Sequence, residues 1–157
     1  IILKQQINMK KTIILLIMAA FCTITHAQSA LFNKYENQQD VTTVVVSKTM
    51  FRMMPSLNVG NRNMKKIASK IDQLKVMTCE RNAIITKISS DAKRIFDKKP
   101  WEEVMRYKEG NNNTIIYMQP LDKGKYEYSL YNVDKGELEI ISIIGNLTLQ
   151  EIQSITE

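Results

Sequence analysis

The stretch Val41–Met54, VTTVVVSKTMFRMM, decides how the rest of the chain is expected to fold. Six of its first eight residues are β-branched, and stiffness at χ1 favours extended backbone over helix. Four of these are valines, which predicts a strand buried on both faces and therefore inside a sheet. The Met-rich end predicts a short helix that Thr49 caps and Pro55 ends. We therefore expect this segment at the centre of the fold.

The first residues resemble a targeting segment. Two lysines follow Met9, an apolar run comes next, and Ala27 supplies a small residue before Gln28. The apolar run is far shorter than the roughly 20 residues that a membrane-spanning helix needs. We predict a cleaved signal peptide over residues 1–27, with residues 1–8 upstream of the natural start.

The predicted location is the periplasm or the outside of the cell. A lipid anchor on Cys22 is the alternative, although Phe21 stands where such processing needs a small residue. Residues 28–157 then form one predicted domain with no transmembrane segment. Its net charge falls from +6 to +3, because three lysines and no acid are removed. Interspersed charges of this size do not favour nucleic-acid binding.

The mature chain lacks most groups that catalysis uses. The one histidine, His26, leaves with the signal peptide, and Cys79 is the remaining cysteine. Histidine-dependent triads, common zinc sites and an internal disulfide are therefore excluded within residues 28–157. No nucleotide-binding or metalloprotease motif is present. We predict no catalytic residue, no metal ligand, no cofactor and no enzyme activity, and a buried apolar role for Cys79.

Methionines suggest an alternative function. Met50, Met53 and Met54 are close in sequence to Met64 and Met77, and thioethers are soft ligands for Cu(I). Methionines at helical spacing beside a strand more commonly fill a core. A small-ligand or copper-binding periplasmic protein, with a pocket near the first three methionines, is the alternative interpretation.

The remaining pattern predicts an α+β domain. A second strand ends at Cys79, and the order strand, helix, strand is typical of a parallel crossover. Three strands then form a meander through turns that contain glycine, over Thr114–Gln119, Lys125–Asn132 and Glu137–Ile144. A capping box begins the last helix. We expect a two-layer sandwich with a mostly antiparallel sheet, a C-terminal β-meander and helices packed on one face.

The turn at Asp134–Gly136 sets which side chains share a face. If it is a three-residue loop, Val133 faces Glu137, and one face of the meander becomes strongly apolar. The opposite face is then mixed and forms a candidate interaction surface. The N-terminal segment covering this surface is the alternative. The predicted surface consists of Ile115, Tyr117, Tyr131, Ile141 and Ile143.

Several short motifs resemble a known family. They are Val41-Thr42-x-Val44-x-Val46-Ser47-Lys48-x-Met50-Phe51, Ile67-Ala68-Ser69-Lys70-Ile71-Asp72, Met105-Arg106-x-Lys108 and Gly145-Asn146-Leu147. The chain resembles small secreted domains of unknown function from Gram-negative bacteria of the gut-commensal type. The resemblance implies an envelope location and brings no established activity, ligand or catalytic residue.

These observations favour a non-catalytic secreted or periplasmic protein that acts as an interaction or accessory module of the cell envelope. The expected partner is another envelope protein, and association of identical copies is compatible with the sequence.

Overall fold

The computed structural model describes residues 27–53, 58–59, 62–63 and 65–156. The predicted signal peptide lies outside the described residues except for Ala27, which begins the first described helix. Within the described part of the chain, no helix is both long enough and apolar enough to cross a membrane.

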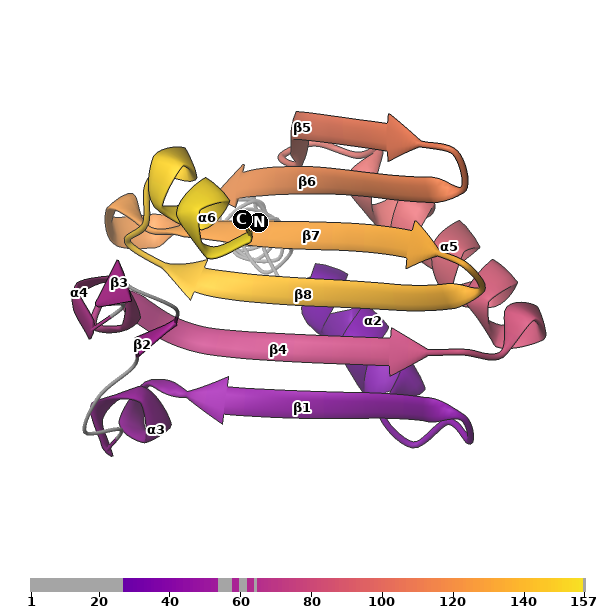
Figure 1. Cartoon of the computed structure of the whole chain (residues 1–157), viewed down its shortest axis with the longest axis horizontal. Helices are drawn as coiled ribbons and strands as arrows, with labels where there is room; N and C mark the ends of the chain where they lie inside the picture. Colours follow the sequence, from indigo (N-terminus) through magenta and orange to yellow (C-terminus); the bar gives the residue numbers. More distant parts are fainter. Residues whose placement is uncertain (1–26, 54–57, 60–61, 64, 157) are drawn as a thin grey trace, which may run out of the picture.

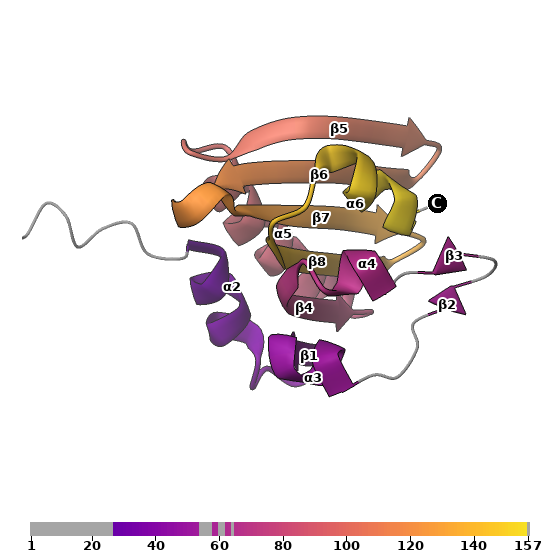
Figure 2. The ribbon, with the colours of Figure 1, turned by 90° about the vertical axis from the view of Figure 1, so that its left-hand side faces the viewer.

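Six strands form the main sheet, and helices lie on both of its faces (Figures 1 and 2). The strands are β1 (Val41–Ser47), β4 (Ile71–Cys79), β5 (Glu102–Glu109), β6 (Asn112–Pro120), β7 (Tyr126–Asp134) and β8 (Glu137–Gly145). The helices are α2 (Ala27–Tyr35), α3 (Lys48–Met53), α4 (Lys65–Ala68), α5 (Asn82–Phe96), the 3₁₀ turn η2 (Asp122–Gly124) and α6 (Leu149–Thr156). Two short strands, β2 (Asn58–Val59) and β3 (Arg62–Asn63), pair with each other.

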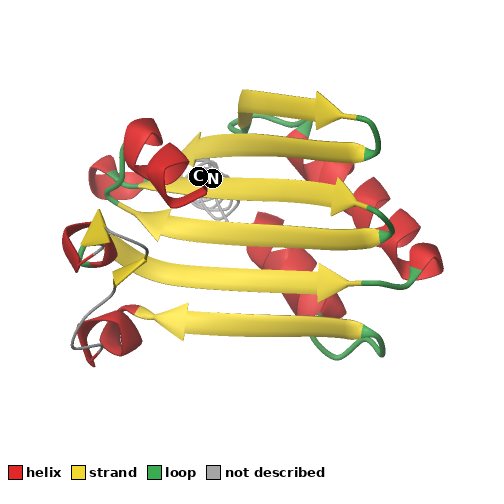
Figure 3. Ribbon diagram, in the orientation of Figure 1, coloured by secondary structure: helices red, strands yellow, loops and turns green. Residues whose placement is uncertain are grey.

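The strand order is β1-β4-β8-β7-β6-β5, and every neighbouring pair is antiparallel (Figure 3). The predicted α+β class and C-terminal meander are therefore confirmed. The helices differ from the prediction, because α2 and α5 cover one face while α6, with the short helices α3 and α4, packs on the other (Figure 2). We call these the α5 face and the α6 face.

β1 is at the edge of the sheet, so the prediction of a central strand is wrong. The predicted parallel crossover is also wrong, since β1 and β4 are antiparallel. Between these strands, the only helices among the described residues are the short α3 and α4, of six and four residues, and neither runs the length of a seven-residue strand as a crossover helix does. Two valines of β1 instead remain open to solvent, with Val44 48% and Val45 58% exposed, while Val41 and Val46 are partly buried.

The meander register differs from the predicted one by one residue. Lys135 and Gly136 both have positive φ, 48° and 84°, and Asp134 pairs directly with Glu137. The loop thus has two residues rather than three, as in a type I′ hairpin. A shift of one residue moves every side chain of β8 to the opposite face.

Two separate cores result, one on each face. The α5 face buries Leu31, Phe32, Tyr35, Met77, Cys79, Ile85, Ile88, Ala92, Phe96, Trp101, Ile115, Tyr117, Leu138 and Ile140. The α6 face buries Ile71, Ile116, Tyr128, Ile143, Leu147 and Ile152. Cys79 is 2% exposed, as expected for a core residue.

Candidate functional site

Residues on the α6 face form three rows across the sheet, because directly paired residues of antiparallel strands point to the same side. The first row is Leu74, Ile143, Tyr128 and Met118. The second row is Val76, Ile141, Leu130, Ile116 and Met105. The third row is Thr78, Glu139, Asn132, Thr114 and Tyr107. Two apolar rows therefore lie beside one polar row.

All residues of these rows except Met118 and Thr78 line a groove of about 980 Å³. Its floor comes from the first two rows, while Asn132, Thr114 and Glu139 contribute polar groups from the third. Helix α6 lines the groove with Ile152 and Gln153. We call this feature the α6 groove.

The local sequence explains why α6 holds this place. Thr148 and Glu151 form the predicted capping box: Glu151 Oε2 accepts from the Thr148 amide at 3.0 Å, and Thr148 Oγ1 accepts from the Glu151 amide at 3.3 Å. The Lys70 ammonium lies 2.6 Å from Glu151 Oε1, and its hydrogen bond lowers the pKa of that carboxyl. Ile152 is 2% exposed, so the helix presents an apolar side to the sheet.

Two polar side chains in and beneath the groove are hydrogen-bonded within the protein. The Tyr128 hydroxyl donates to the Leu147 carbonyl at 3.0 Å, and burial raises the pKa of Tyr128. Thr114 Oγ1 donates to Asn132 Oδ1 at 2.9 Å. Such a site binds by removing apolar surface from water. The polar third row, along one side of the groove, fixes the orientation of what binds there.

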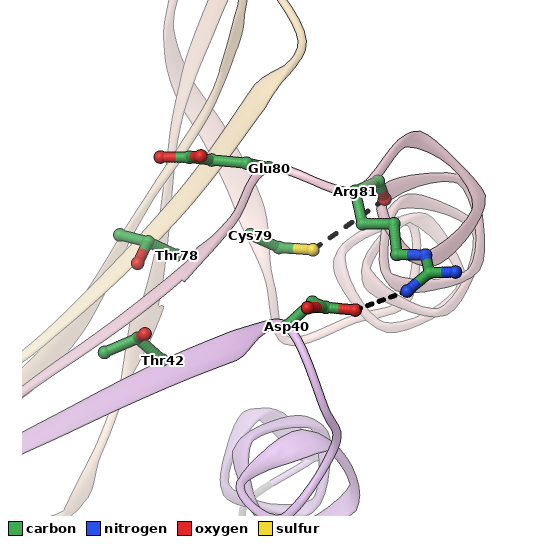
Figure 4. A pocket seen from close by; sticks show the side chains of 6 residues that line it. All are labelled: Asp40, Thr42, Thr78, Cys79, Glu80 and Arg81. Carbon is green, nitrogen blue, oxygen red and sulfur yellow. Dashed lines mark hydrogen bonds and ion pairs between the residues drawn. The ribbon is translucent and has the colours of Figure 1, made fainter.

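A second hollow, of about 520 Å³, lies at the end of β1 and β4 (Figure 4). Arg81 Nη1 donates to Asp40 Oδ2 at 2.6 Å, and the Cys79 thiol points toward the Arg81 carbonyl at 3.8 Å. Because the thiol is buried and directed at backbone, this hollow offers an ion pair rather than a nucleophile.

The structure does not bring the five predicted surface residues together. Ile115, Tyr117 and Tyr131 lie on the α5 face, where Tyr117 stacks on Phe96 with ring centroids 4.4 Å apart. Ile141 and Ile143 lie on the α6 face and belong to the groove.

The expectation of one exposed patch is therefore wrong, and the one-residue register shift is the cause. The groove residues of β4 and β5, among them Val76 and Met105, were not predicted. The face of the sheet on which these residues lie depends on how distant strands pair. The local pattern of β8 alone does not determine that face.

The described methionines do not converge on a metal site. Met50 and Met53 lie on α3, 51% and 73% exposed, whereas Met77 is fully buried on the α5 face. Met54 and Met64 lie outside the described residues. Across the part of the chain that is described, no group of three or more His, Cys, Asp or Glu side chains is placed to hold a metal ion.

Comparison with known proteins gives a family without an assigned activity. A family profile described as a domain of unknown function, DUF4252, matches residues 35–155. No curated protein sequence matches the chain. Among solved structures, the protein of unknown function PA94 from Pseudomonas aeruginosa, suggested to be a regulator, is similar over 77% of this chain and 78% of its own, with 7% identity and a TM-score of 0.36. A similarity at that level supports no inference.

Proposed function

This chain belongs to the DUF4252 family of domains of unknown function, and we propose that it is a non-catalytic interaction module of the cell envelope whose α6 groove binds an apolar segment of another protein. The observation that carries the proposal is the pair of apolar rows left partly uncovered beside α6. The signal-like N-terminal segment and the resemblance to secreted domains support the envelope location.

The groove has the character of an interaction site rather than of a core defect. Leu74, Val76, Leu130 and Ile141 are only partly buried, although they continue a face whose other end is sealed by α6. Apolar area contributes about 25 cal/mol per Å² when it is removed from water, so covering this floor is favourable. A partner helix with an apolar stripe is one kind of segment that would bind in such a groove.

Glu139 adds direction to this recognition. It is the charged member of the third row and stands beside Asn132 in the register. We expect the partner segment to place a polar or basic side chain over this row, because an unpaired charge at an interface edge otherwise loses hydration.

A small apolar ligand is the second candidate. The groove volume of about 980 Å³ lies within the range of small-molecule sites. This candidate replaces the copper interpretation, because Met77 is buried on the α5 face, apart from the exposed Met50 and Met53.

The proposal is tested with tagged protein expressed in its own cells and crosslinked before purification. Ile141→Thr and Leu130→Thr place a polar group in the groove floor, and Ile95→Thr is the matched control on α5. We expect one dominant envelope protein to be recovered with wild type and with the control but not with the groove variants. Equal recovery with all variants of unchanged melting temperature would contradict the proposal. Native mass spectrometry that finds a small apolar molecule instead would favour the second candidate.

A further inference from the structure

The two edges of the sheet differ in how they are protected. In β5, five of eight residues are charged, in the sequence EEVMRYKE, and the pairing with β6 shifts between Glu103 and Met105. Charges and bulges of this kind keep edge strands from pairing with other chains. In β1, VTTVVVS has no charge and no proline, and its register with β4 is unbroken.

The β1 edge is open on both sides of the strand. Val44 on the α6 face is 48% exposed and Val45 on the α5 face is 58% exposed. Among the described strands, β4 is the one neighbour that β1 has (Figure 3). A β-branched edge with free backbone groups is expected to gain a neighbour or to aggregate.

From this contrast we propose that β1 pairs with β1 of a second copy, antiparallel about a two-fold axis through Val44, so that two sheets join into one. A two-fold axis perpendicular to the sheet keeps the α6 faces of both copies on one side and the α5 faces on the other. Directly paired residues share a face, so the residue on the axis must pair with the same residue of the second copy. Pairing centred on Val44 aligns all seven residues of the strand, since Val41 then faces Ser47 of the second copy.

Charges at the ends of β1 agree with this register. Centring on Val44 places Lys48 level with Asp40 of the second copy. Asp40 carries an ion pair with Arg81 at 2.6 Å, and Lys48 carries one with Asp72 at 2.7 Å. Each end therefore brings the Asp40–Arg81 ion pair of one copy beside the Lys48–Asp72 ion pair of the other, with the Lys48 ammonium available to Asp40 at the polar hollow. Self-complementarity of this kind selects a second copy rather than an unrelated strand.

The pairing would also extend the α6 groove. Val44 stands next to Val76 in the register, so the second apolar row reaches the edge of the sheet. Centred on Val44, that row continues directly into the same row of the second copy. The inference does not depend on the proposed partner, because association of two copies is measured without it.

The first test is sedimentation equilibrium of the purified protein. We expect a dimer that Val45→Lys converts to monomer, raising the dissociation constant at least about tenfold, because a charge is placed in the pairing edge. Tyr107→Lys is the matched control, since Tyr107 is 48% exposed on the opposite edge, and it should leave the dimer intact. A monomeric wild type, or a dimer that only the control disrupts, would overturn the proposal.

The second test fixes the register and does not depend on loss of association. In a Cys22→Ser background, Val44→Cys should form an intermolecular disulfide under mild oxidation, because the two cysteines face each other. Val46→Cys should not, because its copy lies about four residues, or about 13 Å, along the strand. Cys79 is buried and contributes no background. Equal crosslinking of both variants, or none with Val44→Cys, would show the register to be wrong.

Discussion

Gly145 lies where β8 passes closest to the end of α4. A Cβ atom at this position would stand 2.2 Å from the Lys70 carbonyl oxygen and 3.1 Å from Ile71 Cα. Both are backbone atoms, so neither can turn aside as a side-chain tip can. The next amide, that of Asn146, donates to the same carbonyl at 3.1 Å. This close backbone approach explains the glycine of the Gly-Asn-Leu motif.

Gly145→Ala should lower the free energy of unfolding by about 1–3 kcal/mol, because the backbone must shift to make room for one methyl group. Urea denaturation followed by circular dichroism measures this. Asn146→Ala is the control, since its side chain is exposed and its amide is retained. If the alanine at Gly145 is tolerated as well as the control, the close approach is wrong.

Asp91 joins α2 to α5. Its carboxylate accepts from the Lys34 ammonium at 2.6 Å and from the Tyr35 hydroxyl at 2.8 Å, and these bonds hold its pKa below the ordinary value. Burial, and then the bond to Asp91, raise the pKa of Tyr35 to about 12. The carboxylate thus contributes stability above the unfolded pKa near 4, and this contribution is lost as pH falls through the lowered folded value.

Asp91→Asn should cost about 1–2 kcal/mol at pH 7, because the side chain is 13% exposed and accepts a charged donor. The difference from wild type should begin to shrink as pH falls below about 4, where the unfolded carboxyl takes up its proton, and should be lost below the lowered pKa of the folded carboxyl. Asp97→Asn, at the residue that follows the same helix, is the control, since the ion pair with Lys93 is solvent-exposed and contributes little to stability. A difference that is constant from pH 7 to pH 3 would contradict the assigned titration.

At the scale of elements, α6 closes one end of the groove. Its side chain Ile152 is buried against the sheet. Ile152→Ala should cost about 2–5 kcal/mol, the usual range for removing a buried aliphatic side chain. Gln150→Ala changes an exposed position of the same helix and should be near neutral. Chemical denaturation of both variants measures these changes in the free energy of unfolding. An Ile152 variant as stable as wild type would mean that α6 does not pack on this face.

Elements with strong local signals were predicted well from the sequence. α6 begins at its predicted capping box, and the three meander strands appear with their ends shifted by no more than two residues. Local interactions determine such elements, so a single sequence reveals them.

Long-range placement was predicted less well. The valines of Val41–Val46 fit a buried central strand equally as well as an open edge, and only the pairing with β4 decides between them. The turn Asp134-Lys-Gly is compatible with two or three loop residues, and that single residue reverses the face of Ile141 and Ile143. The candidate surface was therefore divided between two faces, and the groove was not foreseen.

For the whole molecule, the main asymmetry is between the two faces of the sheet. The helices α2 and α5 cover the α5 face, whereas α6 and the short helices α3 and α4 pack on the α6 face (Figures 1 and 2). The apolar rows of the groove on the α6 face stay partly open. Open apolar surface of this extent commonly marks a site of association. This asymmetry is the basis for proposing a binding module rather than an enzyme.

Site-specific photocrosslinking tests that proposal most directly. A benzophenone amino acid is placed at Leu130, in the groove floor, and in a separate variant at Thr86, an exposed position on α5. After irradiation of living cells, the account predicts that the Leu130 variant gives one discrete crosslinked product with another protein and that the Thr86 variant gives none. No product at Leu130, or the same product from both positions, would contradict the α6 groove as the binding site.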